Sequence, residues 1–256
     1  MIVLEVENYQ QMSEKAANIM FQYVAEGKKA VLGLATGGTP VKTYDLLVSR
    51  IQNEKTDLSH VHTVNLDEYI GLDEKHPQSY HHFMEEHLFQ HVPIPKKQTH
   101  LPNGNAEDLN EECIHYEQII ESLGGVDIQL LGIGANGHIG FNEPGTPFDQ
   151  KTHLVDLAPS TREANARFFA SLDEVPKKAI TMGIATIMNS KNILLLASGE
   201  SKADALKQLI EGSVSEACPA TVLQKHPSLT IIADEAALSS LSDEARSKIN
   251  QSNVSC

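Results

Sequence analysis

The sequence predicts a single α/β domain: a doubly wound, mostly parallel sheet with helices on both faces, as in Rossmann-like folds. Short and almost continuously apolar runs recur along the chain, and each is followed by a segment with helical periodicity. Such runs are typical of strands buried on both faces, and parallel sheets covered by helices contain strands of this kind. No internal repeat or low-complexity linker divides residues 1–256, so one domain is expected throughout.

The expected elements follow from this alternation. Apolar runs predict strands at 2–6, 30–35, 61–66, 126–134, 192–197 and 229–233. Helical spacing of apolar residues predicts helices at 8–26, 39–52, 79–90, 107–122, 200–211 and 234–248. Four histidines in and beside the third helix are interpreted as solvated: His81, His82, His87 and His91. Residues 152–181 fit the alternation least well and are either a flap over the surface or an ordinary insertion.

Composition and charge restrict the classes of function. Asp and Glu number 34 against 20 Lys and Arg, so the formal net charge is −14 and neither nucleic acid nor an anionic membrane is an expected partner. Cys113, Cys218 and Cys256 form no CxxC pair, which favours a reducing compartment over a structural zinc site. The chain starts without a signal-peptide pattern, and its apolar runs are too short to span a membrane. We therefore expect a cytoplasmic protein.

Doubly wound sheets bind ligands beyond the carboxyl ends of their strands, so the chemistry is sought there. The run at 30–35 ends in a small-residue turn made of Thr36, Gly37, Gly38, Thr39 and Pro40. Adjacent glycines let backbone amides approach a ligand closely, and Thr39 suits the N-cap of a following helix. Free amides at a helix N-terminus would face an anion such as phosphate. A plain strand-to-helix turn is the alternative.

The run at 61–66 is followed by two acids, Asp67 and Glu68. A carboxylate at a strand end can act as a general base, and partial burial raises its pKa toward neutrality. Asp67 is the better candidate because its shorter side chain is held more rigidly. The alternative is that Asp67 caps a turn while Glu68 is solvated.

A glycine-rich loop follows the run at 126–134 and contains the pattern G-x-G-x-x-G. The glycines and prolines after it leave no room for the helix that a dinucleotide site requires, so this pattern is not interpreted as such a site. The loop instead carries His138 and Glu143. An imidazole titrates near neutral pH and a nearby carboxylate can orient it, which favours proton transfer over a purely structural histidine.

The run at 192–197 leads into a second small-residue turn and then to Lys202, in the first turn of the expected helix. The helix dipole disfavours a cation at that position, which indicates an anion that compensates it. A solvated lysine is the alternative reading.

Five segments, in chain order, resemble the glucosamine-6-phosphate deaminases (isomerising): LGLATGGTPVKTY, NLDEYIGL, GIGANGHIGFNEPG, TREANARFF and SGESKADAL. The resemblance covers about residues 2–235. It implies conversion of D-glucosamine 6-phosphate and water into D-fructose 6-phosphate and ammonia, in amino-sugar catabolism, without a metal or an organic cofactor. A hydrolase similar to the 6-phosphogluconolactonases and a non-catalytic sugar-phosphate sensor are the alternatives.

The resemblance also implies roles for individual residues. Asp67 would remove the C2 proton of the sugar, and His138, assisted by Glu143, would open the pyranose ring. Arg167 and Lys202 would bind the phosphate together with the turn at 36–39. The segment at about 152–181, which contains Arg167, would form a mobile lid over the sugar.

The chain departs from the family pattern in two respects. Many members carry Asp two residues before the ring-opening histidine, where this chain has Asn136. Its carbonyl can orient the imidazole but carries no charge, so Glu143 is expected to be the principal carboxylate partner.

Members regulated by N-acetylglucosamine 6-phosphate carry basic residues about where Lys151, His153 and Val155 stand. Only Lys151 is a permanent cation there. We therefore expect an unregulated monomer, with a homo-oligomer as the alternative.

Overall fold

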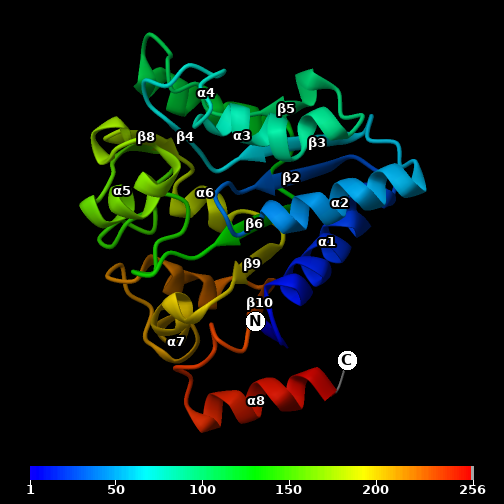
Figure 1. The fold of residues 1–256 in the computed structure, drawn as a ribbon, viewed down its shortest axis with the longest axis vertical. Helices are drawn as coiled ribbons and strands as arrows, with labels where there is room; N and C mark the ends of the chain where they lie inside the picture. Colours follow the sequence, from blue (N-terminus) through cyan, green and yellow to red (C-terminus); the bar gives the residue numbers. More distant parts are fainter. Residues whose placement is uncertain (255–256) are drawn as a thin grey trace.

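The computed structural model describes residues 1–254, and a seven-stranded parallel sheet forms its centre (Figure 1). Neighbouring strands follow the order β1 (Ile2–Val6), β10 (Leu229–Asp234), β9 (Ile193–Ala197), β6 (Ile128–Gly132), β2 (Ala30–Leu34), β3 (Val61–Asn65) and β5 (Thr99–His100). Every pair of neighbours is parallel. The doubly wound fold and its expected strands are confirmed, while β5, at the edge, was too short to give a periodic signal.

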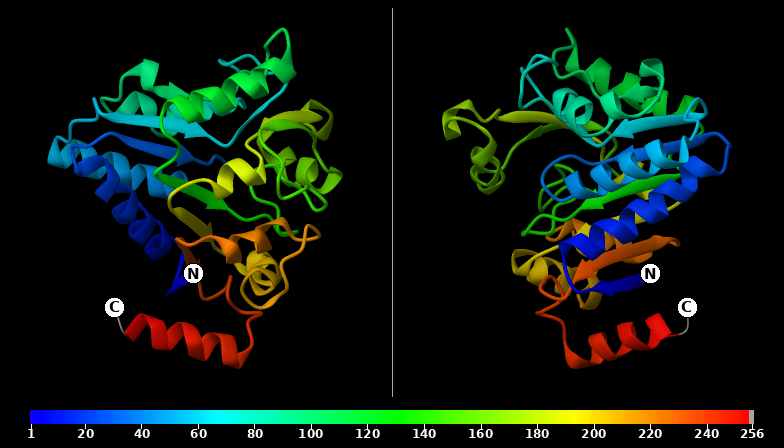
Figure 2. Two further views of the ribbon diagram at one scale, coloured as in Figure 1. Left: turned by 180° about the vertical axis from the view of Figure 1, so that it is seen from behind. Right: turned by 45° about the vertical axis from the view of Figure 1, so that its right-hand side comes forward.

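The helices cover both faces of this sheet. They are α1 (Tyr9–Ala25), α2 (Val41–Glu54), α3 (Tyr80–His87), α4 (Leu109–Ser122), α5 (Pro159–Asn165), α6 (Ile184–Met188), α7 (Ala203–Glu211) and α8 (Asp243–Val254). Figure 2 shows α1 and α2 on one face and α4 and α6 on the other. β2 and β9 are buried at every position, as their continuously apolar sequences predict.

The prediction of a helix over 234–248 is wrong at its start. The carboxylate of Asp234 accepts hydrogen bonds from the amides of Gly199 and Ala237, and turns follow it before α8 begins. The hydroxyl of Ser242 accepts a hydrogen bond from the amide of Ala245, as a helix N-cap does, and this fixes the start of α8. Hydrogen bonds between the side chains of Asp and Ser and the nearby backbone compete with helix formation, so α8 begins later in the chain than the prediction.

A second, antiparallel sheet has the order β4 (Asp67–Tyr69), β8 (Lys178–Thr181) and β7 (His153–Asp156). β7 and β8 form the two ends of the irregular segment 152–181, with α5 and two short 3₁₀ turns between them. Asp67 lies opposite Thr181 in the pairing of β4 with β8. The segment is therefore joined directly to the strand that carries Asp67.

The order of strands in the parallel sheet reverses between β2 and β6. From β2 the chain continues outward through β3 to β5, and from β6 it continues in the opposite direction through β9 to β10. Crevices at such a reversal are the usual ligand sites of doubly wound sheets. The carboxyl ends of these strands face the side on which α5 and α7 lie (Figure 2).

Cys113 and Cys218 are free, buried thiols, and Cys256 lies outside the described residues. Along residues 1–254, no helix has the length and apolar character needed to cross a bilayer.

Candidate active site

A cavity of about 430 Å³ lies at the reversal of strand order, among the loops that follow β2, β3, β6 and β9. Residues from α5 and the 3₁₀ turn after it close one side. The predicted site residues that line it are Thr36, Gly37, Gly38, Thr39, Asp67, His138, Arg167 and Lys202. Side chains that are far apart in the sequence thus meet in one cavity.

The turn after β2 forms one wall of the cavity. Gly37 has a φ of +87°, a left-handed conformation that favours glycine. The hydroxyl of Tyr9 donates to the carbonyls of Gly38 and Thr39, each at 3.1 Å, and holds the turn against α1. The prediction of Thr39 as N-cap is wrong, because the first bond of α2 runs from Tyr44 N to Pro40 O and places Pro40 at the N-cap.

Two cations share the wall next to this turn. Lys202 ends a 3₁₀ turn and occupies the N-cap position of α7, just before the first helical turn predicted for it. Burial and the charge of Arg167 both lower the pKa of Lys202. A guanidinium nitrogen of Arg167 lies close enough to Gly38 that an added Cβ would be 3.7 Å from it. An anionic group between these cations would relieve their repulsion, so the arrangement suits a phosphate.

Asp67 lines the cavity and is 6% exposed. Burial, and then the charge of Glu68, raise the pKa of Asp67 to about 8. Within the described chain, no hydrogen bond ties its carboxylate to a turn amide, so the turn-cap alternative does not hold. A carboxyl group with a pKa near 8 is a far stronger base than an exposed aspartate.

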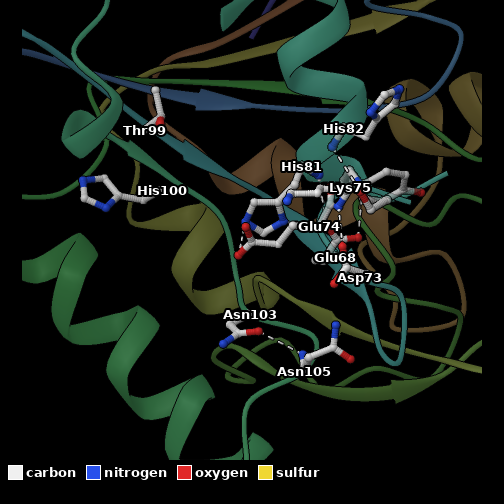
Figure 3. Close-up of polar contacts among 12 residues, drawn as sticks. Glu68, Asp73, Glu74, Lys75, His81, His82, Thr99, His100, Asn103 and Asn105 are labelled. Atoms are coloured by element: carbon white, nitrogen blue, oxygen red, sulfur yellow. Dashed lines mark hydrogen bonds and ion pairs between the residues drawn. The ribbon is translucent and has the colours of Figure 1, made fainter. Parts of the chain in front are cut away.

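Glu68 points away from the cavity and is 2% exposed, so the alternative that it is solvated is wrong. Its carboxylate accepts hydrogen bonds from the amides of Tyr80 and His81 at the start of α3, each at 3.0 Å. The ring Nδ1 of His81 lies 2.8 Å from it (Figure 3). The interpretation of His81 as solvated is therefore also wrong, because this ring bridges α3 and β4.

His138 lies on the glycine-rich loop after β6 and lines the same cavity as the turn at 36–39. Gly134 is required there because a Cβ at that position would clash with the imidazole. Nδ1 of His138 lies 3.6 Å from a carboxylate oxygen of Glu143, an ion-pair distance. Residues 133–152 contain no helix, which confirms that the G-x-G-x-x-G pattern opens none here.

Asn136 does not orient the imidazole as expected. Its carbonyl accepts a hydrogen bond from the backbone N–H of His138 at 3.2 Å, and its amide donates to Glu143 at 2.8 Å. An amide has both a donor and an acceptor, so it ties the loop to the carboxylate instead. Burial opposes ionisation of Glu143, but its contacts with His138, Thr161 and Asn136 prevail and lower its pKa.

Sequence reasoning missed two residues of α5 that contact the site. The hydroxyl of Thr161 donates to Glu143, and the amide of Asn165 donates to the hydroxyl of Tyr69 at 2.9 Å. Both lie in the segment TREANARFF, from which the family resemblance assigned a role to Arg167 alone. An uncharged side chain gives no comparable signal in a single sequence.

Comparison with known proteins shows the family of the chain. A family model described as glucosamine-6-phosphate isomerases/6-phosphogluconolactonase matches residues 5–232. The chain belongs to this family.

Curated relatives named glucosamine-6-phosphate deaminase match almost the whole chain. One from Shouchella clausii is 56% identical over 96% of this chain and 99% of its own. Another, from Bacillus subtilis and named glucosamine-6-phosphate deaminase 1, is 53% identical over 93% of this chain and 99% of its own.

Solved structures give the same result for the fold. A structure described as a monomeric glucosamine-6-phosphate deaminase has a TM-score of 0.92 at 52% identity, covering 94% of this chain and 100% of that one. A 6-phosphogluconolactonase from Trypanosoma brucei has a TM-score of 0.76 at 17% identity, over 94% of this chain and 98% of that one. The second likeness shows the fold alone.

Proposed function

We propose that this chain is a glucosamine-6-phosphate deaminase that converts D-glucosamine 6-phosphate and water into D-fructose 6-phosphate and ammonia. One observation carries the proposal: a buried carboxyl group, an imidazole with a carboxylate partner and a pair of cations converge on one cavity. An isomerising deamination requires an enolising base, a ring-opening acid–base group and a phosphate site. Relatives of that name, more than half identical to this chain, support the same reaction.

Ring opening is assigned to His138. Its imidazole takes the proton of the anomeric hydroxyl and returns it to the ring oxygen, which breaks the bond between C1 and that oxygen and leaves the open aldehyde. Glu143 stabilises the imidazolium that forms between these transfers. A positioned acid or base of this kind contributes about 10²–10⁴-fold to the rate.

Enolisation is assigned to Asp67. The carbonyl at C1 acidifies the proton on C2, the carboxylate of Asp67 removes it, and an enolamine forms. Reprotonation at C1 gives a ketimine at C2, which water attacks, and ammonia leaves as the ketone forms. The raised pKa of Asp67 makes it a strong base that is still partly ionised near neutral pH.

Phosphate binding is assigned to Arg167, Lys202 and the turn at 36–39. The phosphate is remote from C1 and C2, so its binding energy can position the reacting carbons without taking part in the chemistry. The segment 152–181 is assigned as a lid, because its α5 contacts both Glu143 and Tyr69 and its Arg167 faces the phosphate site.

We also propose that the protein is a cytoplasmic monomer and that N-acetylglucosamine 6-phosphate does not regulate its activity. The similar solved structure described as monomeric supports the assembly state. Burial lowers the pKa of His153, and Val155 is apolar, so two of the three positions that resemble an effector site carry no cation at neutral pH.

A coupled assay tests the proposed reaction. The protein should release ammonia from glucosamine 6-phosphate in step with formation of fructose 6-phosphate, and it should not accelerate hydrolysis of 6-phosphogluconolactone. Lactone hydrolysis without ammonia release would instead assign it to the lactonases. Binding of the amino-sugar phosphate without turnover would assign it to the sensors.

A further inference from the structure

The carboxylate of Glu68 is fully occupied by hydrogen-bond donors. One oxygen accepts from the amides of Tyr69 at 2.7 Å and Tyr80 at 3.0 Å. The other accepts from the amide of His81 at 3.0 Å and contacts its ring Nδ1 at 2.8 Å. Three of these four contacts come from backbone amides, which can only donate, so the arrangement suits a carboxylate that accepts. The ring of His81 would supply a fourth donor to such a carboxylate through Nδ1–H.

His81 is held between two carboxylates, as Figure 3 shows. Its Nδ1 faces Glu68, and its Nε2 lies 3.8 Å from the carboxylate of Glu74. The two contacts differ in kind: the side chain of Glu68 is 3% exposed, whereas that of Glu74 is 67% exposed. Only the contact with Glu68 is shielded from solvent, so only that one fixes the position of a buried group.

Glu68 and Asp67 are consecutive residues of β4, so their side chains point to opposite faces of the strand. Asp67 faces the cavity, and Glu68 faces the N-terminus of α3. The positive end of the α3 dipole adds to the four donors that hold Glu68 in place. Because one face of this short strand is fixed, the direction of the residue on its other face is fixed with it.

We propose that Glu68 and His81 are positioning residues for Asp67, fixing the direction of its carboxylate and placing a negative charge next to it. The inference deepens the proposed function and depends on the role of Asp67 as the base. Neither residue touches the cavity, so both act through Asp67 and not on the sugar.

The charge of Glu68 has a consequence for pH dependence. It raises the pKa of Asp67, in addition to the larger effect of burial. The titratable groups that interact electrostatically with Asp67 from β4, α3 and α4 are Tyr69, Tyr80 and Tyr116. The other titratable or charged groups that line the same cavity are His138, Arg167 and Lys202, from the loop after β6, the 3₁₀ turn after α5 and the start of α7. Burial raises the pKa of all three tyrosines, so they stay neutral over the working range. Glu68 is therefore the nearest fixed negative charge along the strand.

The test compares pH profiles of kcat/KM for ammonia release from glucosamine 6-phosphate. Asp67 acts as a base only when ionised, so kcat/KM rises as pH passes through its pKa. Glu68→Gln removes the neighbouring charge and makes ionisation easier, which should move this rise to lower pH by about one unit. Loss of positioning should also lower kcat by about tenfold, with KM little changed.

A pair of variants at position 81 tests positioning without altering Glu68. His81→Ala removes the ring donor and should lower kcat about fivefold while KM and the melting temperature change little. His81→Asn places an amide N–H near the former Nδ1 and should restore most of that loss. Glu74→Gln, which alters only the exposed partner of His81, is the matched control and should behave as the unmodified enzyme.

The outcomes separate this inference from the proposed function. It is overturned if Glu68→Gln leaves the profile in place, or if His81→Ala and His81→Asn have equal kcat values. Should Glu68→Gln fail to fold, the pair at position 81 decides alone. Asp67→Asn in the same assay checks the base itself: if that variant turns over normally, the proposed function fails, whatever the other variants do.

Discussion

At the scale of single residues, burial makes the carboxylate of Asp67 a stronger base and lowers the stability of the folded protein at alkaline pH. This carboxyl group is almost fully buried, and its pKa of about 8 lies far above that of an aspartate in an unfolded chain. The folded protein therefore keeps the proton up to a pH at which the unfolded chain has lost it. A group of this kind stabilises the fold below its unfolded pKa and loses that contribution as pH rises through its folded pKa.

Asp67→Asn should therefore stabilise the protein at alkaline pH. The asparagine is neutral throughout, so the variant avoids a burial cost on the order of a few kcal/mol that the ionised aspartate incurs above pH 8. Thermal unfolding at pH 5 and pH 9 measures this, and the advantage of the variant should grow between the two. Asp45→Asn, on the exposed face of α2, is the control. An advantage that is equal at both pH values would show that Asp67 is not strongly perturbed.

At the scale of elements, α5 links segment 152–181 to the ring-opening group. Thr161 completes the hydrogen bonding of Glu143, and the other carboxylate oxygen is held by Asn136. β8, which pairs with β7, also pairs with β4 and so joins the same segment to the strand that carries Asp67. Both proposed acid–base groups are therefore connected to one segment, the proposed lid.

Thr161→Val should impair ring opening by leaving an oxygen of Glu143 without its donor. The expected loss in kcat is about tenfold, equivalent to one hydrogen bond to a charged group. Thr161→Ser keeps the hydroxyl and should retain most of the activity. The measurement is steady-state ammonia release from glucosamine 6-phosphate by the two variants and the unmodified enzyme. Equal rates for the two variants would show that the hydroxyl has no role.

At the scale of the whole molecule, the proposal is a self-sufficient monomer. A relative with a TM-score of 0.92 is described as monomeric. Allosteric regulation of the kind found in symmetric oligomers requires coupled sites, which a monomer with one site lacks.

Sedimentation equilibrium should accordingly give a single species near 28.0 kDa. Initial rates should follow a hyperbola in glucosamine 6-phosphate, with no change on adding N-acetylglucosamine 6-phosphate. A larger species whose sigmoidal rate curve becomes hyperbolic with that compound would contradict the proposed assembly and its lack of regulation.

The sequence predicted the features that depend on local pattern. Continuous apolar runs predicted the parallel strands, and small or charged residues at strand ends marked Asp67, His138 and Lys202. It failed where the surroundings of a residue are set by the folded structure, or where the residue type gives no signal. The burial of Glu68 depends on α3, the role of Asn136 depends on the fold of its own loop, and Thr161 is uncharged. Short strands such as β4 and β8 carry too few residues to show a period.

The central claim is that Asp67 removes the C2 proton of a sugar whose phosphate is held at the other end of the cavity. The most direct measurement follows deuterium entry from heavy water into the sugar, with Asp67→Asn beside the unmodified enzyme. The variant should bind glucosamine 6-phosphate normally, yet release almost no ammonia and exchange almost no hydrogen at C2. Normal exchange and turnover in that variant would contradict the claim.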